Sequence, residues 1–280
     1  MNSAIELLGY GVAVPVVIAL AIVGFSQRFL ATPAAGRYGL AVALAAAFLA
    51  GYALLPSWAS LVPQRHWHWL PYLGAGAMVL GPVGVASGIS AAERWVLYLL
   101  LAIVAACLLV PAWPNLQPPR SVLVIILAAY LFFLMALADA LPDRLLGTLF
   151  LRLLCVVAAA TAILIAVAVS LRIGQVAGIA AAALLGCCVL PLRNQQAVAI
   201  RGLIPAFAVI VGGVAFAGGI EPQPPKIGIL LASASILGLW ACAWGPLARL
   251  RGFADAAAQT ASVLVPLAVV GAWALFSGGF

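Results

Sequence analysis

Charged residues are scarce in this chain. They make up 7% of its 280 residues, whereas about a quarter of the residues of a typical soluble domain are charged. Hydrophobic residues make up 67%, and the mean hydropathy is +1.25. This composition excludes a soluble globular protein and predicts a polytopic membrane protein in contact with the lipid bilayer. The basic residues stand singly between apolar runs, which is typical of membrane loops, so we expect no nucleic-acid partner.

Residues that bind metals or cofactors are also few. There are 2 histidines and neither lies in an apolar run, which argues against a bis-histidine haem carrier. The 5 cysteines all lie in apolar runs without CxxC or Cys/His spacing, so neither zinc nor a disulfide framework is expected. Walker, HExxH and GxSxG motifs are missing. We therefore expect no cofactor, no metal and no enzymatic activity.

Long apolar runs are plentiful. A membrane-spanning helix needs roughly 20 apolar residues, and about ten stretches fit this length. The N-terminus contains no Lys or Arg before the first stretch, so it lacks the basic region of a secretory signal, and the first helix is expected to be retained. The predicted spans are 5–25, 39–56, 70–89, 95–112, 120–139, 147–170, 174–191, 202–220, 227–245 and 257–276. Since the connections are short, they form one all-α membrane domain.

An internal duplication is indicated by two of these stretches. Gly39–Pro56 matches Gly174–Pro191 without a gap at 8 of 18 positions, at an offset of 135 residues. We therefore divide the chain into a first five-helix repeat, 1–140, and a second, 141–280. With five helices in each repeat, the two repeats run in opposite directions through the membrane. This inverted-topology arrangement is used by many secondary transporters.

The basic residues predict the orientation. Nine of the 13 Lys and Arg residues fall on one set of alternate connections, and that side is expected to face the cytoplasm. Both termini are then outside the cytoplasm, in a multi-pass protein of the cell inner membrane. The five-plus-five plan resembles that of the drug/metabolite transporter superfamily in architecture alone. The sequence patterns of that superfamily are absent, and its members keep both termini inside.

Glycine interrupts two predicted spans that occupy matching places in the repeats. Gly84 lies in the Gly/Pro-rich span 70–89, and Gly213 lies in the span 202–220. In inverted-repeat transporters the substrate site lies near the midplane, at helices broken by Gly or Pro. The alternative is that these glycines allow close helix packing.

Polar residues within or beside the spans are the other candidates for a substrate pathway. Arg152 lies inside the span 147–170, with Asp139 as its expected partner, unless it extends to the interface. Asp255, Gln259 and Ser262 follow one face of the last helix. Asp255 also has a structural reason to stand there, because a carboxylate is favourable at a helix N-terminus.

The two histidines, His66 and His68, lie in a tryptophan-rich segment. In an extended chain, side chains two residues apart face the same way, so a metal site is geometrically possible. The competing interpretation is an interfacial aromatic loop, because no carboxylate or cysteine nearby completes a site.

Two functions remain open. The first is a secondary transporter or permease for a small neutral or lipophilic molecule, supported by the predicted inverted repeat and the glycine-broken helices. The second is a non-catalytic membrane subunit that scaffolds or anchors a larger complex, supported by how few polar groups lie at membrane depth. A polar cavity between the two halves favours the first.

Overall fold

The structure is a computed structural model that describes all residues except 1–8, 30–32, 56–61, 87, 115, 144, 146, 190–195, 223–225 and 277–280. The described residues form helices and connecting turns, without a strand. The all-α prediction is therefore confirmed.

The helices follow one another along the chain with short connections. In the first half they are η1 (Gly9–Ala13), α2 (Val14–Phe29), α3 (Pro33–Ala53), η2 (His66–Trp69), α4 (Leu70–Gly84), α5 (Ala91–Leu109) and α6 (Arg120–Asp139). In the second half they are α7 (Gly147–Ala168), α8 (Leu171–Val189), α9 (Gln196–Phe207), η3 (Ala208–Gly212), α10 (Gly213–Ile220), η4 (Ile227–Ile229), α11 (Leu230–Ala234), η5 (Ser235–Leu239), α12 (Trp240–Ala243), η6 (Gly245–Arg249) and α13 (Phe253–Phe276).

Seven helices among the described residues are long and apolar enough to cross a membrane. They are Gly9–Arg28, Ala91–Leu109, Arg120–Asp139, Gly147–Ala168, Leu171–Val189, Ala197–Ile220 and Phe253–Ala274. This set fits a multi-pass membrane protein. The other three predicted spans correspond to shorter or broken helices: the apolar part of α3, α4, and the segment from η4 to α12.

The connection between α7 and α8 is shorter than predicted. The predicted spans leave 171–173 between them, but α7 ends at Ala168 and α8 begins at Leu171. Gly174 lies in the first turn of α8, where a side-chain carbon would meet Ala166 of α7. This close approach allows the two helices to pack as a tight hairpin.

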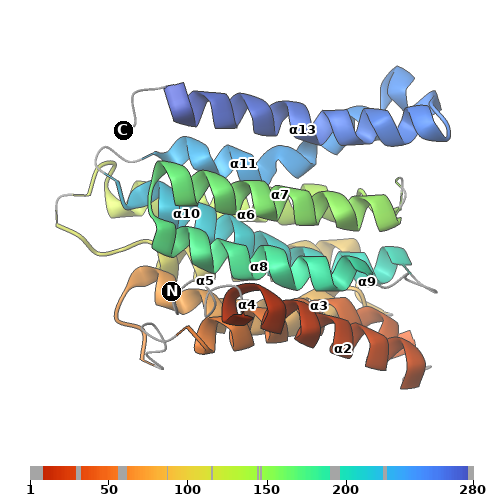
Figure 1. The fold of residues 1–280 in the computed structure, drawn as a ribbon, viewed down its shortest axis with the longest axis horizontal. Helices are drawn as coiled ribbons and strands as arrows, with labels where there is room; N and C mark the ends of the chain where they lie inside the picture. Colours follow the sequence, from red (N-terminus) through yellow and green to blue (C-terminus); the bar gives the residue numbers. More distant parts are fainter. Residues whose placement is uncertain are drawn as a thin grey trace.

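The helices lie side by side along the long axis of the molecule, with α13 at one edge and α2 at the other (Figure 1). The start of α2 and the end of α13 lie at the same end of the bundle (Figure 1). We call that end, which holds the start of α6, the Arg120 end. The opposite end, which holds the start of α5, is the Arg94 end.

The continuous helix formed by α9, η3 and α10 lies at the centre. Every residue of its most apolar window is buried, and it contacts α3, α4, α6, α7 and α8. The helix is irregular: Pro205 removes one backbone hydrogen bond, and η3 is a π-helical turn. Beside it, the backbone of Gly202 approaches Gly81 of α4 so closely that a side-chain carbon on Gly81 would meet the Gly202 carbonyl oxygen.

Candidate functional site

A buried carboxylate organises the Arg94 end. Asp139, the last residue of α6, is 3% exposed. Its Oδ1 accepts a hydrogen bond of 3.0 Å from the Tyr98 hydroxyl, and its Oδ2 lies 3.1 Å from Arg94 Nε. The contact with Arg94 is an ion pair without the alignment of a hydrogen bond. Because Arg94 and Tyr98 are four residues apart on α5, both side chains reach the same carboxylate.

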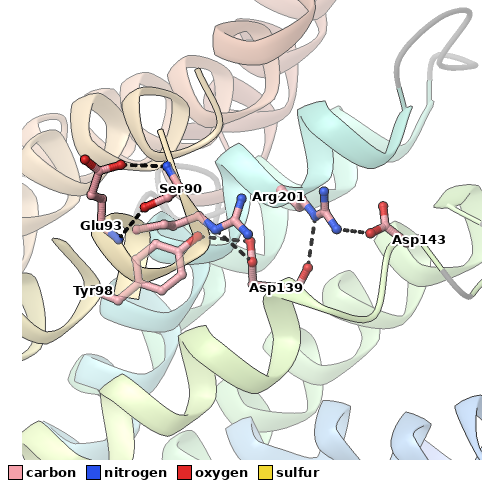
Figure 2. A network of polar contacts seen from close by, with 7 residues as sticks. Ser90, Glu93, Tyr98, Asp139, Asp143 and Arg201 are labelled. Carbon is pink, nitrogen blue, oxygen red and sulfur yellow. Dashed lines mark hydrogen bonds and ion pairs between the residues drawn. The ribbon is translucent and has the colours of Figure 1, made fainter. Parts of the chain in front are cut away.

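A second arginine joins the network from the central helix. Arg201 of α9 donates from Nε to the Asp139 carbonyl oxygen at 3.1 Å, and it forms an ion pair with Asp143 (Figure 2). The side chain of Asp143 is 51% exposed, so this second ion pair faces water. Together the contacts join α5, α6 and α9 at one end of the bundle.

The start of α5 is fixed by a capping box. The Ser90 hydroxyl accepts from the Glu93 backbone N–H at 3.2 Å, and the Glu93 carboxylate accepts from the Ser90 N–H at 2.6 Å (Figure 2). This pair satisfies two backbone donors of the first turn. It therefore sets the position of Arg94, the next residue in the helix.

The predicted pairing of Arg152 with Asp139 is wrong. Arg152 is exposed on α7, and Asp139 is paired with Arg94. The predicted span 95–112 begins one residue after Arg94 and so left Arg94 in a connection. The capping box begins α5 at Ala91, which places Arg94 inside the helix and within reach of Asp139.

The two predicted pathway glycines lie in different surroundings. Gly84, at the end of α4, is buried, and a side-chain carbon there would lie 3.3 Å from Cγ of Arg94. Gly84 therefore borders the polar network. Gly213 is fully inside the apolar core, where a side-chain carbon would lie 2.7 Å from Leu70 and 3.0 Å from Leu109. Its surroundings are those of a packing residue.

The polar stripe of the last helix forms in part. Gln259 of α13 is 1% exposed, and its Nε2 donates to Asp255 Oδ1 at 2.9 Å. The Ser262 hydroxyl donates to the Gln259 carbonyl of its own helix at 2.8 Å. A side-chain carbon on Gly238 of η5 would meet the Ser262 carbonyl oxygen, so this face packs closely against the interrupted helix. Gln259 Oε1 is buried without a hydrogen-bond partner among the described residues.

Sequence reasoning missed a further polar contact, between α6 and the interrupted segment. The Tyr130 hydroxyl lies 2.6 Å from Ser233 Oγ and donates to the Leu230 carbonyl at 3.0 Å. Both serine and tyrosine are common in apolar helices, and no spacing in the sequence links positions 103 residues apart. The ring of Tyr130 also borders Gly212 of the π-helical turn.

A cavity of about 560 Å³ lies at the Arg120 end. It is lined by η2, the end of α5, the start of α6 and the residue that follows α10. The side chains that line it with charge or aromatic rings include Arg65, His66, Trp69, Trp113, Arg120 and Glu221. The cavity and the Asp139 network therefore lie at opposite ends of α5, α6 and the central helix.

The two histidines lie in a 3-10 turn, not in the extended segment that the metal-site interpretation assumed. Each is 8% exposed. The His66 ring lies edge-on to Trp113 at 5.5 Å, whereas His68 packs on Trp67 and its Nδ1 accepts from the Gln64 N–H. Burial lowers the pKa of His66 to about 4 and also lowers that of His68. Within the described part of the chain, no three His, Cys, Asp or Glu residues cluster to hold a metal ion.

The chain was compared with known proteins. No protein-family model, no curated protein and no solved structure matches it.

Proposed function

We propose that the protein is a secondary transporter or permease for a small molecule with a largely neutral or lipophilic body. The observation that carries this proposal is the contrast between the two ends of the bundle. A polar cavity lies at the Arg120 end, and a buried ion-paired network closes the Arg94 end. A protein that alternates access needs such an opening on one side and such a closure on the other.

We further propose that ten segments cross the membrane as two inverted halves, 1–140 and 141–280. Helix contacts support this division. The hairpin of α2 and α3 has its counterpart in α7 and α8, and the pair α5 and α6 has its counterpart in the contacts of α11 and η5 with α13. The matching helices α3 and α8, and likewise α4 and α9, pack directly against each other. Matching elements meet in this way around the axis of an inverted repeat.

The central helix supplies the element that can change shape. Pro205 and the π-helical turn η3 weaken its regular hydrogen bonding between the two ends of the bundle. Its neighbours at this depth are mainly apolar side chains, with Tyr130 and Ser233 as a polar contact. We propose that a substrate with an apolar body passes beside this helix, with Gly84 and Asp139 bordering the closed end.

The charge distribution supports an orientation in the cell inner membrane. The Arg94 end holds the starts of α5, α9 and α13 (Figure 1). Arg94 and Arg201 lie near the starts of α5 and α9, and Arg249 and Arg251 directly precede α13. These four arginines belong to the nine basic residues on the predicted cytoplasmic side. We propose that this end faces the cytoplasm and both termini face outward. A reporter that works only outside the cytoplasm should be active when it is fused after Phe280, and a reporter that works only in the cytoplasm should be silent there. The opposite result would reverse the orientation.

Transport is tested in proteoliposomes. Purified protein should take up members of a panel of neutral metabolites and lipophilic ions in a saturable way, and Gly84→Leu should abolish uptake, because its side chain would displace Arg94. Arg172→Gln, at the opposite end of the bundle, is the matched control and should transport normally. If nothing in the panel is transported and the protein purifies only with stoichiometric partner subunits, a scaffold or anchor in a membrane complex replaces this proposal.

A further inference from the structure

The cavity at the Arg120 end is lined by more positive than negative side chains. Arg65 and Arg120 are positive, Glu221 is negative, and all three line the cavity and are exposed. Neither Arg65 nor Glu221 has an ion-pair partner in the part of the chain that the structure describes. One guanidinium therefore remains without a matching carboxylate, so the cavity has a net affinity for a single negative charge.

The guanidinium of Arg120 is held in place by the end of α5. Its Nε donates to the Val110 carbonyl at 3.4 Å, and its Nη2 donates to the Cys107 carbonyl at 3.1 Å. These carbonyl groups lie at a helix C-terminus, where they lack partners within the helix. Because guanidinium has five N–H donors, the remaining ones are available to a ligand without a further loss of side-chain freedom.

His66 is a buried residue of the cavity wall with a ring nitrogen that makes no hydrogen bond in the described part of the chain. It is 8% exposed, and its Nε2 has no hydrogen-bond partner among the described residues. In the neutral tautomer that carries its proton on Nε2, His66 can donate to a ligand oxygen, and this hydrogen bond would satisfy that buried group. Its ring is fixed edge-on against Trp113, which also lines the cavity.

We infer that this cavity binds the carboxylate of a small organic monoacid, with the acid group at Arg65, Arg120 and His66 and the apolar body against Trp69 and Trp113. Its volume, about 560 Å³, lies within the range of roughly 300–1,000 Å³ that is usual for small-molecule sites. The Glu221 carboxylate repels a second negative charge and so disfavours dianions. This inference rests on the proposed function, because it assigns the substrate class to the outward-facing end of the same pathway.

Benzoate and benzamide are matched probes, since they differ in charge and share size and shape. Calorimetric titration of the detergent-purified protein should show saturable binding of benzoate and binding at least tenfold weaker for benzamide. Arg65→Gln and His66→Phe should each weaken benzoate binding about tenfold, which corresponds to ~1.4 kcal/mol. Arg65→Lys should retain part of the affinity. Arg172→Gln, which removes an arginine outside the cavity at the same end, should bind benzoate like the unchanged protein.

Three results overturn the inference. Equal affinity for benzoate and benzamide would show that the charge of the ligand does not contribute to binding. Unchanged affinity for benzoate in both Arg65→Gln and His66→Phe would show that benzoate binds outside this cavity. Loss of benzoate binding in nanodiscs that contain anionic phospholipid, but not in neutral ones, assigns the site to a lipid headgroup.

The titration needs no transport, so the two proposals fail separately. Uptake in proteoliposomes without benzoate binding refutes this inference alone. Benzoate binding without uptake of any substrate refutes the transporter.

Discussion

The ion pair between Arg94 and Asp139 gives the sharpest test of the structure. The Asp139 side chain is 5% exposed and that of Arg94 is 16% exposed, so each charge depends on the other. Removing one partner of a buried ion pair costs roughly 3–5 kcal/mol, because the remaining charge is stranded. The hydrogen bond from Tyr98 stays when Arg94 is replaced, so we take the lower figure. Arg94→Met, which keeps the apolar stem, should therefore destabilise the protein by about 3 kcal/mol.

The measurement is a double-mutant cycle on the protein in mild detergent. At about 2 °C or more per kcal/mol for a chain of this size, Arg94→Met should lower the midpoint of thermal unfolding by roughly 6 °C. Asp139→Leu should have a similar effect, and the double variant should recover much of the loss. Asp143→Ala is the control, because that exposed carboxylate should contribute less than about 1 kcal/mol. Effects of Arg94→Met and Asp139→Leu that add within about 0.5 kcal/mol would refute the pairing.

Three further predictions follow from other contacts. Gly81→Ala in α4 should lower the midpoint of thermal unfolding, since the new methyl group meets the backbone of the central helix. Gly76→Ala, also in α4, has open space and should be neutral or stabilising. Equal effects of the two variants would contradict the close packing at Gly81. Tyr130→Phe should destabilise by about 1 kcal/mol and Ser233→Ala should add little more in the double variant, because they share one hydrogen bond. The free energy of unfolding should fall as the pH is lowered from about 6.5 to about 4, because in this range His66 binds a proton in the unfolded state but stays neutral in the folded state. A His66→Phe variant should lack this contribution, which amounts to up to roughly 3 kcal/mol between the two pH values.

The fold class was predictable because composition and run length decide it. Apolar stretches of the right length become helices wherever water is excluded, and seven of the described helices are long and apolar enough to cross a membrane. The segment from Ile227 to Ala243 departs from this rule, since it alternates between 3-10 and α-helical turns. Serine side chains bond back to carbonyls three residues earlier there, and Gly238 packs on the backbone of α13. Hydropathy cannot detect such local competition, because it sums over the whole stretch.

The candidate site was predictable only in part. The stripe of Asp255 and Gln259 follows from helical spacing, and the structure joins these two side chains. The partner of Asp139 depends instead on which helices pack together and on where α5 begins. A one-turn error at that boundary moved Arg94 into a loop and left Arg152 as the apparent partner. Long-range pairing of this kind requires tertiary contacts, which a single sequence does not supply.

The central helix connects the two ends of the bundle in one covalent element. Arg201 near its start contacts Asp139, and Glu221 directly after its end lines the cavity. Between them, Pro205 and the π-helical turn are the places where the helix bends or shifts at the least cost in hydrogen bonds. Under the proposed function, we expect a displacement at the cavity to reach the Asp139 network through this helix. Under the proposed function, ligand binding at Arg120 should weaken the contact of Arg201 with Asp139. In the unchanged protein, ligand binding should then make the Arg94 end more accessible to water-soluble reagents. If this accessibility stays constant at saturating ligand, the cavity and the Asp139 network are not coupled.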